Sequence, residues 1–97
     1  MGEYIPRIPT EDLVHIEFVN PDPDERDREG IELRGELITA LKNGNINKQK
    51  YNIVFHSTNG VLKIYSTIWI VGEKYIGVKG NLVIPISSIL DIRIWKN

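Results

Sequence analysis

The sequence predicts a mainly β protein, built as a small, strongly bent antiparallel barrel of five or six strands with at most one short helix. The main observation concerns residues 50–95, where apolar runs alternate with turn clusters at 58–60, 72–74 and 79–81, as successive hairpins require. These strands are too few for a typical sandwich. With 97 residues, of which 41% are hydrophobic, the whole chain (1–97) is expected to form one domain with one modest core.

The β-rich segment 50–95 also shows where individual strands bend or end. Side chains of the first strand, 51–57, alternate between two faces. The long run 61–71 changes its apolar phase near residues 66–67, which predicts a bulge or bend there. Pro85 cannot donate a backbone hydrogen bond, so its strand is expected at a sheet edge or broken at the proline. A last alternating strand is predicted from Ile89 onward.

The front of the chain has a different pattern. Residues 1–9 contain two prolines, which favour an extended N-terminal arm. Thr10 is a candidate N-cap for a single helical turn, because its hydroxyl can accept a backbone N–H, and residues 14–19 then alternate as a strand. Residues 20–30 (NPDPDERDREG) offer nothing apolar to bury, so they are expected to form an acidic flexible loop.

Residues 31–41 fit two patterns. As a helix, Leu33, Leu37 and Leu41 stack at intervals of four residues. Gly35 would then cost the helix about 1 kcal/mol relative to alanine. As a strand, the segment alternates strictly between apolar and polar residues as far as Leu37. This alternation favours a strand there, and a helix is the alternative.

The residues that carry enzyme chemistry are scarce. The absence of cysteine excludes disulfides and thiolate chemistry, and is typical of a reducing compartment. His15 and Glu17 share a strand face, but no third metal ligand accompanies them. No glycine-rich phosphate loop or nucleophile elbow is present. We therefore expect a protein that is not an enzyme, with no metal, no cofactor and no small-molecule substrate.

The sequence leads us to expect neither a membrane-spanning helix nor a signal peptide. No stretch approaches the roughly 20 apolar residues that a membrane helix needs. The first residues, MGEYIPRIPTEDL, lack the apolar region of a signal peptide. The expectation is a cytoplasmic protein without membrane contact.

Charge is divided unevenly along the chain. Residues 1–36 hold eleven acids against four arginines, whereas residues 37–97 hold eight bases against two acids. Two interpretations remain open. Either the acidic front half packs against the basic back half and their fields largely cancel, or the basic half offers a surface to a polyanion.

Nucleic acid is the polyanion that the pattern suggests, because lysines and aromatic residues are interleaved in the back half. Bases stack on exposed aromatic rings with about 1–3 kcal/mol each, while cations follow the phosphates. Lysine, however, outnumbers arginine seven to one in residues 37–97, and direct base readout favours arginine. The candidate nucleic-acid-binding residues are Lys63, Lys74, Lys79, Asn81, Arg93 and Trp95.

Short segments, about twenty residues in all, resemble the Sm-like family of small RNA-binding barrels. Residues 41–44 (LKNG) are similar to that family's first-motif turn, and residues 78–81 (VKGN), followed by Val83, are similar to its second-motif loop. The closing IPISSILDIRI resembles the last two strands of Sm-like barrels in bacterial Rho-binding antiterminators.

This resemblance implies an SH3-like or Sm-like barrel, with RNA contacts at Lys79 and Asn81. Three departures from the family pattern stand beside it. Lys79 replaces the family's arginine, the aspartate expected after the first turn has no counterpart, and a further strand follows the second segment.

The sequence therefore predicts a non-enzymatic β-barrel module for protein–protein interaction or self-association, with an edge near Pro85 and the C-terminal strand that a partner can extend. The alternative is single-stranded RNA or DNA binding on the basic C-terminal face. The exposure of Trp69 and Trp95 discriminates between them, because exposed rings beside lysines would favour nucleic acid.

Overall fold

A computed structural model describes residues 4–19 and 27–94 of the chain. Its elements, in chain order, are η1 (Thr10–His15), α1 (Asp27–Asn47), β1 (Tyr51–Ser57), β2 (Gly60–Ser66), β3 (Ile68–Val71), β4 (Tyr75–Val78), β5 (Leu82–Pro85), η3 (Ile86–Ser88) and β6 (Ile89–Ile94). The strands form two antiparallel sheets, which we call sheet A (β2-β1-β6) and sheet B (β3-β4-β5). The predicted mainly β, antiparallel class is therefore confirmed.

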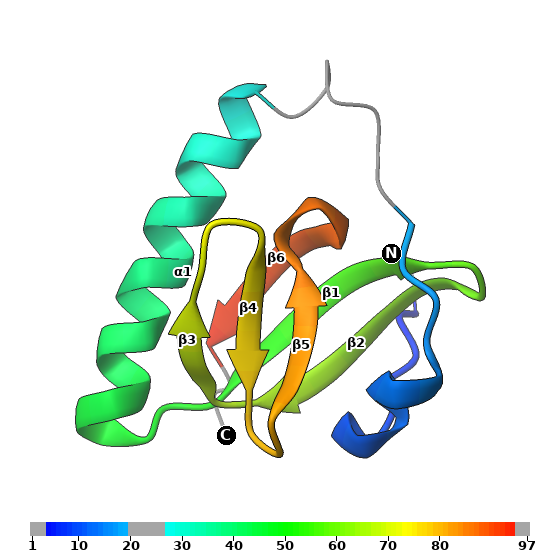
Figure 1. The fold of residues 1–97 in the computed structure, drawn as a ribbon, viewed down its shortest axis with the longest axis horizontal. Helices are drawn as coiled ribbons and strands as arrows, with labels where there is room; N and C mark the ends of the chain where they lie inside the picture. Colours follow the sequence, from blue (N-terminus) through cyan, green and yellow to red (C-terminus); the bar gives the residue numbers. More distant parts are fainter. Residues whose placement is uncertain (1–3, 20–26, 95–97) are drawn as a thin grey trace.

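The two sheets are not closed into a barrel. Each is a separate three-stranded sheet, and helical segments lie along the open sides between them. On one side α1 contacts β3 of sheet B and β6 of sheet A, and on the other η1 contacts β5 and β2. Figure 1 shows α1 beside β3, with the blue helical turn of η1 on the opposite side of the sheets. Helical segments thus cover the apolar interior at the sides where hydrogen-bonded strands would close a barrel.

The chain passes from sheet A to sheet B at Thr67. β2 ends at Ser66 and β3 begins at Ile68, so the predicted bend in the long apolar run is confirmed. Thr67 is buried between the two strands. The predicted turn glycines at 60 and 80 both adopt a positive φ, which glycine tolerates because it has no Cβ.

The strand predicted for the start of segment 31–41 is wrong: these residues lie inside α1, a helix of 21 residues. The prediction of at most one short helix is wrong for the same reason. Leu33, Leu37 and Ala40 are buried, which is the spacing of one helix face. Burial of that face between β3 and β6 offsets the helix penalty of Gly35.

Part of the segment predicted as an acidic loop is helical. Residues 27–30 of the segment 20–30 belong to α1, and residues 20–26 lie outside the described residues. At the other end of the helix, Lys48 adopts φ 54°, the left-handed conformation that commonly follows a helix.

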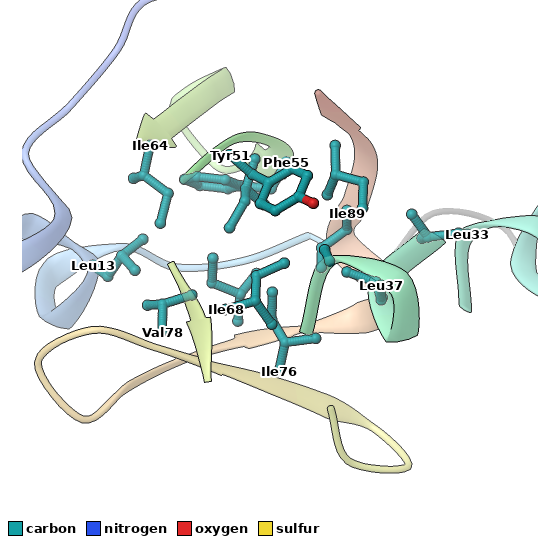
Figure 2. Close-up of a cluster of buried hydrophobic side chains, with 14 of the residues drawn as sticks. Leu13, Leu33, Leu37, Tyr51, Phe55, Ile64, Ile68, Ile76, Val78 and Ile89 are labelled. Carbon is teal, nitrogen blue, oxygen red and sulfur yellow. The ribbon is translucent and has the colours of Figure 1, made fainter. Parts of the chain in front are cut away.

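The core lies between the two sheets (Figure 2). Apolar side chains from both sheets point toward one another, with Leu13 of η1 at one end of the cluster and Leu33 and Leu37 of α1 at the other. Full burial of one such side chain contributes about 1.5–3 kcal/mol. The sheet residues labelled in this cluster are Tyr51, Phe55, Ile64, Ile68, Ile76, Val78 and Ile89.

The front of the chain pairs with sheet A in two places, at the edge strand β2 and at the end of the central strand β1. The extended arm forms a parallel bridge between Arg7 and Lys63, in which the Ile8 amide donates to the Lys63 carbonyl and the Lys63 amide donates to the Pro6 carbonyl, both at 2.9 Å. The strand predicted for 14–19 is reduced to a single bridge between Phe18 and Ser57. The helical turn at Thr10 is confirmed as η1.

Thr10 does not cap that turn as predicted. The N-cap of η1 is Pro9, and no side chain provides a capping hydrogen bond. The Thr10 hydroxyl instead donates to the Tyr65 carbonyl at 3.4 Å. The threonine therefore ties η1 to the edge of β2.

Candidate functional site

The six predicted nucleic-acid-binding residues do not form one patch. Lys63 and Arg93 lie on strands of sheet A, whereas Lys79 and Asn81 lie in the turn between β4 and β5. Lys74 lies in the turn at the other end of β4, about 16 Å from Lys79 at the usual rise of a strand. Trp95 lies outside the described residues.

Asn81 has a conformational reason for its identity. Its φ is 60°, and the preceding Gly80 has φ 92°, so the turn needs two successive residues that tolerate a positive φ. Asparagine and glycine are the residues that do so most readily. The conformation of the turn therefore explains Gly80 and Asn81, two of the residues that make segment 78–81 similar to a nucleic-acid-binding loop.

The outer face of sheet A carries a mixed polar surface. Asn52 of β1 lies between Tyr65 and Arg93 on the neighbouring strands, and Val54 lies between Lys63 and Asp91. Arg93 and Asp91 form an ion pair, with Nε and Oδ2 2.7 Å apart. The positive charge of Arg93 is thus largely balanced on its own strand.

Two cations that the sequence analysis missed lie against one ring of this face. The Arg7 guanidinium carbon is 5.9 Å, and the Lys50 ammonium nitrogen 5.4 Å, from the centre of the Tyr65 ring. Both distances are within the range of cation–π attraction. Nothing in the local sequence places Arg7 there, because its position depends on the parallel bridge between the arm and β2.

The same cations line two neighbouring grooves. One, of about 400 Å³, is lined by Lys50, Lys79 and Tyr65 together with residues of η1 and the β4–β5 turn. The other, of about 280 Å³, is lined by Arg7, Lys63, Asn52, Tyr4 and Ile5. Because Arg7 and Lys50 both contact Tyr65, the grooves adjoin at this ring. We call the four cations Arg7, Lys50, Lys63 and Lys79 the basic track; among the described residues that line the two grooves, Glu11 is the one carboxylate.

The outer face of sheet B has the opposite character. No strand of this sheet contains a charged residue. Ile70, Gly77 and Val83 lie side by side in register across β3, β4 and β5, and Tyr75 pairs with Pro85 in the row closer to the β3–β4 turn. Ile70 and Val83 are 64% and 55% exposed, and Tyr75 is 52% exposed.

Trp69 completes this surface at its β3 margin. The register of β3 against β4 shifts between Ile68 and Ile70, so Trp69 is the extra residue of a bulge. It is 47% exposed. The ring is therefore exposed as nucleic-acid binding would require, but it belongs to an uncharged sheet. We call the exposed side chains Trp69, Ile70, Tyr75 and Val83 the apolar face.

Titratable side chains offer no metal-binding cluster among the residues that the structure describes. This part of the chain contains no group of three or more histidine, aspartate and glutamate side chains that could hold a metal ion. The Arg93–Asp91 ion pair joins two residues of the back half.

Comparisons with protein-family models, curated proteins and solved structures gave no match to this chain. The resemblance to Sm-like proteins therefore stays a prediction. Within the described part of the chain, no helix has the length and apolar character needed to span a membrane.

Proposed function

We propose that this chain is a non-enzymatic interaction module that self-associates through the apolar face. The observation that carries the proposal is the exposure of Trp69, Ile70, Tyr75 and Val83, between 47% and 64%, on a sheet without a charged residue. Contiguous apolar patches of this kind on soluble proteins mark interaction sites. Tryptophan and tyrosine are also the residues that most often dominate the binding energy of an interface.

A second copy fits this face because neither surface brings a charge to it. A buried, unpaired charge would weaken the contact by several kcal/mol, and two uncharged faces avoid this cost. Isologous pairing uses the same patch on both subunits, and sheets pack face to face about 10 Å apart. Four large side chains are few for a specific interface, so we expect a dissociation constant of about 10 μM.

The edge strands β2 and β5 are less suited to bind a partner than the apolar face is. The arm occupies part of the β2 edge through the bridge at Lys63. The edge position predicted for Pro85 is confirmed, but β5 has only four residues and ends at this proline. Extension of that edge by a partner strand is therefore the weaker form of the proposal.

Sedimentation velocity over a range of concentrations tests self-association. The wild type is expected to pass from monomer to dimer, and Ile70→Lys is expected to weaken the dimer at least about tenfold, which corresponds to about 1.4 kcal/mol. Val14→Lys is the matched control, because Val14 is also 64% exposed but lies on η1. A strict monomer at about 1 mM, where association is worth only about 4 kcal/mol, contradicts the proposal.

The basic track supports a second candidate function, single-stranded nucleic-acid binding. Four cations line adjoining grooves, with one carboxylate among the described lining residues, and the Tyr4 side chain, 87% exposed, lies in the same surface. The cations would follow the phosphates and Tyr4 would stack on a base. Tyr65 is expected to position Arg7 and Lys50, since both already lie against its ring.

Titration of a fluorescently labelled single-stranded oligonucleotide tests this second candidate. Binding should weaken steeply with salt, with a slope of about −0.7 for each phosphate contact. Lys63→Ala and Lys79→Ala should each lower the affinity and reduce that slope, whereas Lys42→Ala, which changes an exposed lysine of α1, should leave both unchanged. Equal effects of all three variants, or binding that salt does not weaken, would exclude a specific role for the basic track.

A further inference from the structure

We infer that the groove of about 280 Å³ between the N-terminal arm and sheet A binds a phosphate group, and that the bound phosphate fastens the arm to β2. The site lies at the end of the basic track formed by Arg7 and Lys63. The inference rests on the second candidate function for the source of the phosphate, the backbone of a single strand, because the track continues from this groove to Lys50 and Lys79.

Docking of the arm on β2 brings like charges together. Arg7 and Lys63 are the paired residues of the parallel bridge, and both line the groove. The Arg7 guanidinium also lies against the same Tyr65 ring as the Lys50 ammonium group. Like charges on directly opposed residues of neighbouring strands repel one another. A bound anion would therefore remove an electrostatic cost of docking the arm.

The described carboxylates do not neutralise these cations. Asp91 lies on the same outer face of sheet A, but it is paired with a neighbouring arginine on β6. Glu11 lines the adjoining groove and not this one. Within the described part of the chain, neither Arg7 nor Lys63 forms an ion pair. Both cations therefore line the groove without a counter-charge from these residues.

The side chains that line the groove match a phosphate group in charge and in hydrogen-bond donors. The Arg7 guanidinium can bind two phosphate oxygens at once, and the Lys63 ammonium group adds a compact positive charge. Asn52, on the central strand, adds an uncharged amide, whose Oδ1 atom is buried and receives no hydrogen bond from a described residue. The N–H groups of the three side chains outnumber the two oxygens of a carboxylate, so a phosphate uses them more fully.

Phosphate binding and arm docking are coupled, because the site takes one cation from the arm and one from β2. Two backbone hydrogen bonds of 2.9 Å join these segments, from the Ile8 amide to the Lys63 carbonyl and from the Lys63 amide to the Pro6 carbonyl. A ligand that binds only the docked form stabilises docking by mass action. Because the arm must leave β2 before these two amides can exchange with solvent, their exchange rates measure the coupling.

Amide hydrogen exchange measured by NMR tests the site with two probes, inorganic phosphate and a single-stranded oligonucleotide that has no terminal phosphate. At ten times the dissociation constant of either probe, the Ile8 and Lys63 amides should exchange about tenfold more slowly. Arg7→Gln should abolish this protection. Lys42→Gln, which changes an exposed lysine of α1, should retain it, and the other amide resonances confirm that each variant is folded.

Lys63→Gln separates an anion site from a merely structural lysine. This variant removes one of the two like charges and leaves the backbone pairing intact. Without any phosphate probe, its Ile8 amide should exchange about two- to fivefold more slowly than in the wild type, because the repulsion is gone. Phosphate should then slow it no further. An Ile8 amide that exchanges equally fast or faster in this variant would overturn the electrostatic argument.

The two probes distinguish the site from the second candidate function. Protection by both supports the site with a nucleic-acid strand as its source. Protection by inorganic phosphate alone supports the site but assigns it to a small phosphorylated ligand and removes the second candidate function. An oligonucleotide that binds without protecting either amide overturns the site and leaves that function standing. Absence of binding by both probes overturns the two together.

Discussion

Gly35 and Gly60 show how the fold gives one residue type two different roles. Gly35 lies in α1, where an added methyl group would meet nothing within 4 Å. Gly60 begins β2 with φ 99°, a conformation that side chains with a Cβ rarely adopt. The first glycine is therefore replaceable, and the second is required by the turn.

Gly35→Ala should raise the free energy of unfolding by about 1 kcal/mol, because alanine has the higher helix propensity and no neighbour is displaced. Gly60→Ala should lower it by about 1 kcal/mol or more, because its backbone conformation becomes strained. Urea denaturation of both variants measures the two changes. A destabilising Gly35→Ala would contradict the helical assignment of this segment.

The residue scale also shows why the basic track escaped prediction. Lys63 and Lys79 could be named from the sequence because they lie among aromatic residues of the β-rich segment. Arg7 and Lys50 could not, because their approach to the Tyr65 ring depends on the arm pairing with β2 and on the path between α1 and β1. Such contacts between distant segments leave no local pattern.

At the scale of single elements, α1 is the element whose local sequence pattern favours a strand, whereas its tertiary packing favours a helix. Leu33 and Leu37 belong equally to a strand face and to a helix face, so periodicity alone could not choose between them. The choice follows from the open side between β3 and β6, which the buried face of α1 covers. The strands were predictable because turn glycines, Pro85 and alternation all indicate the same boundaries.

Leu37→Ala should lower the free energy of unfolding by about 2–5 kcal/mol, because Leu37 is fully buried and its loss leaves a cavity. Ile38→Ala, at the neighbouring position, should cost less than about 1 kcal/mol, since Ile38 is 40% exposed. Thermal and urea unfolding of the pair measure the difference. Similar losses at both positions would show that the helix does not bury the face described here.

At the scale of the whole molecule, two helical segments cover the core at the sides where the two sheets leave it open. α1 contacts β3 and β6, and η1 contacts β5 and β2, so both are part of the enclosure of one core. Leu13 carries this role for η1, since it is 4% exposed and belongs to the central apolar cluster. The front of the chain is therefore expected to contribute to global stability.

Leu13→Ala should lower the free energy of unfolding of the full chain by about 2–4 kcal/mol, even though η1 is only six residues long. Val14→Ala, on the exposed side of the same segment, should change it by less than about 0.5 kcal/mol. Urea denaturation again provides the comparison. A negligible effect of Leu13→Ala would mean that η1 is not part of the cooperative unit.

Two surfaces of different chemistry face the solvent: the basic track, which extends from the N-terminal arm and β2 to the β4–β5 turn, and the apolar face on sheet B. The central claim is that the apolar face is where the chain meets a second copy. Methyl NMR spectra of the wild type recorded over a range of protein concentrations test this most directly. The Ile70 and Val83 resonances should shift as concentration rises, while those of Val14 and Leu90, which are also exposed but lie on η1 and β6, should stay unchanged. Spectra that do not depend on concentration, or shifts centred on η1 and β6, would contradict the account.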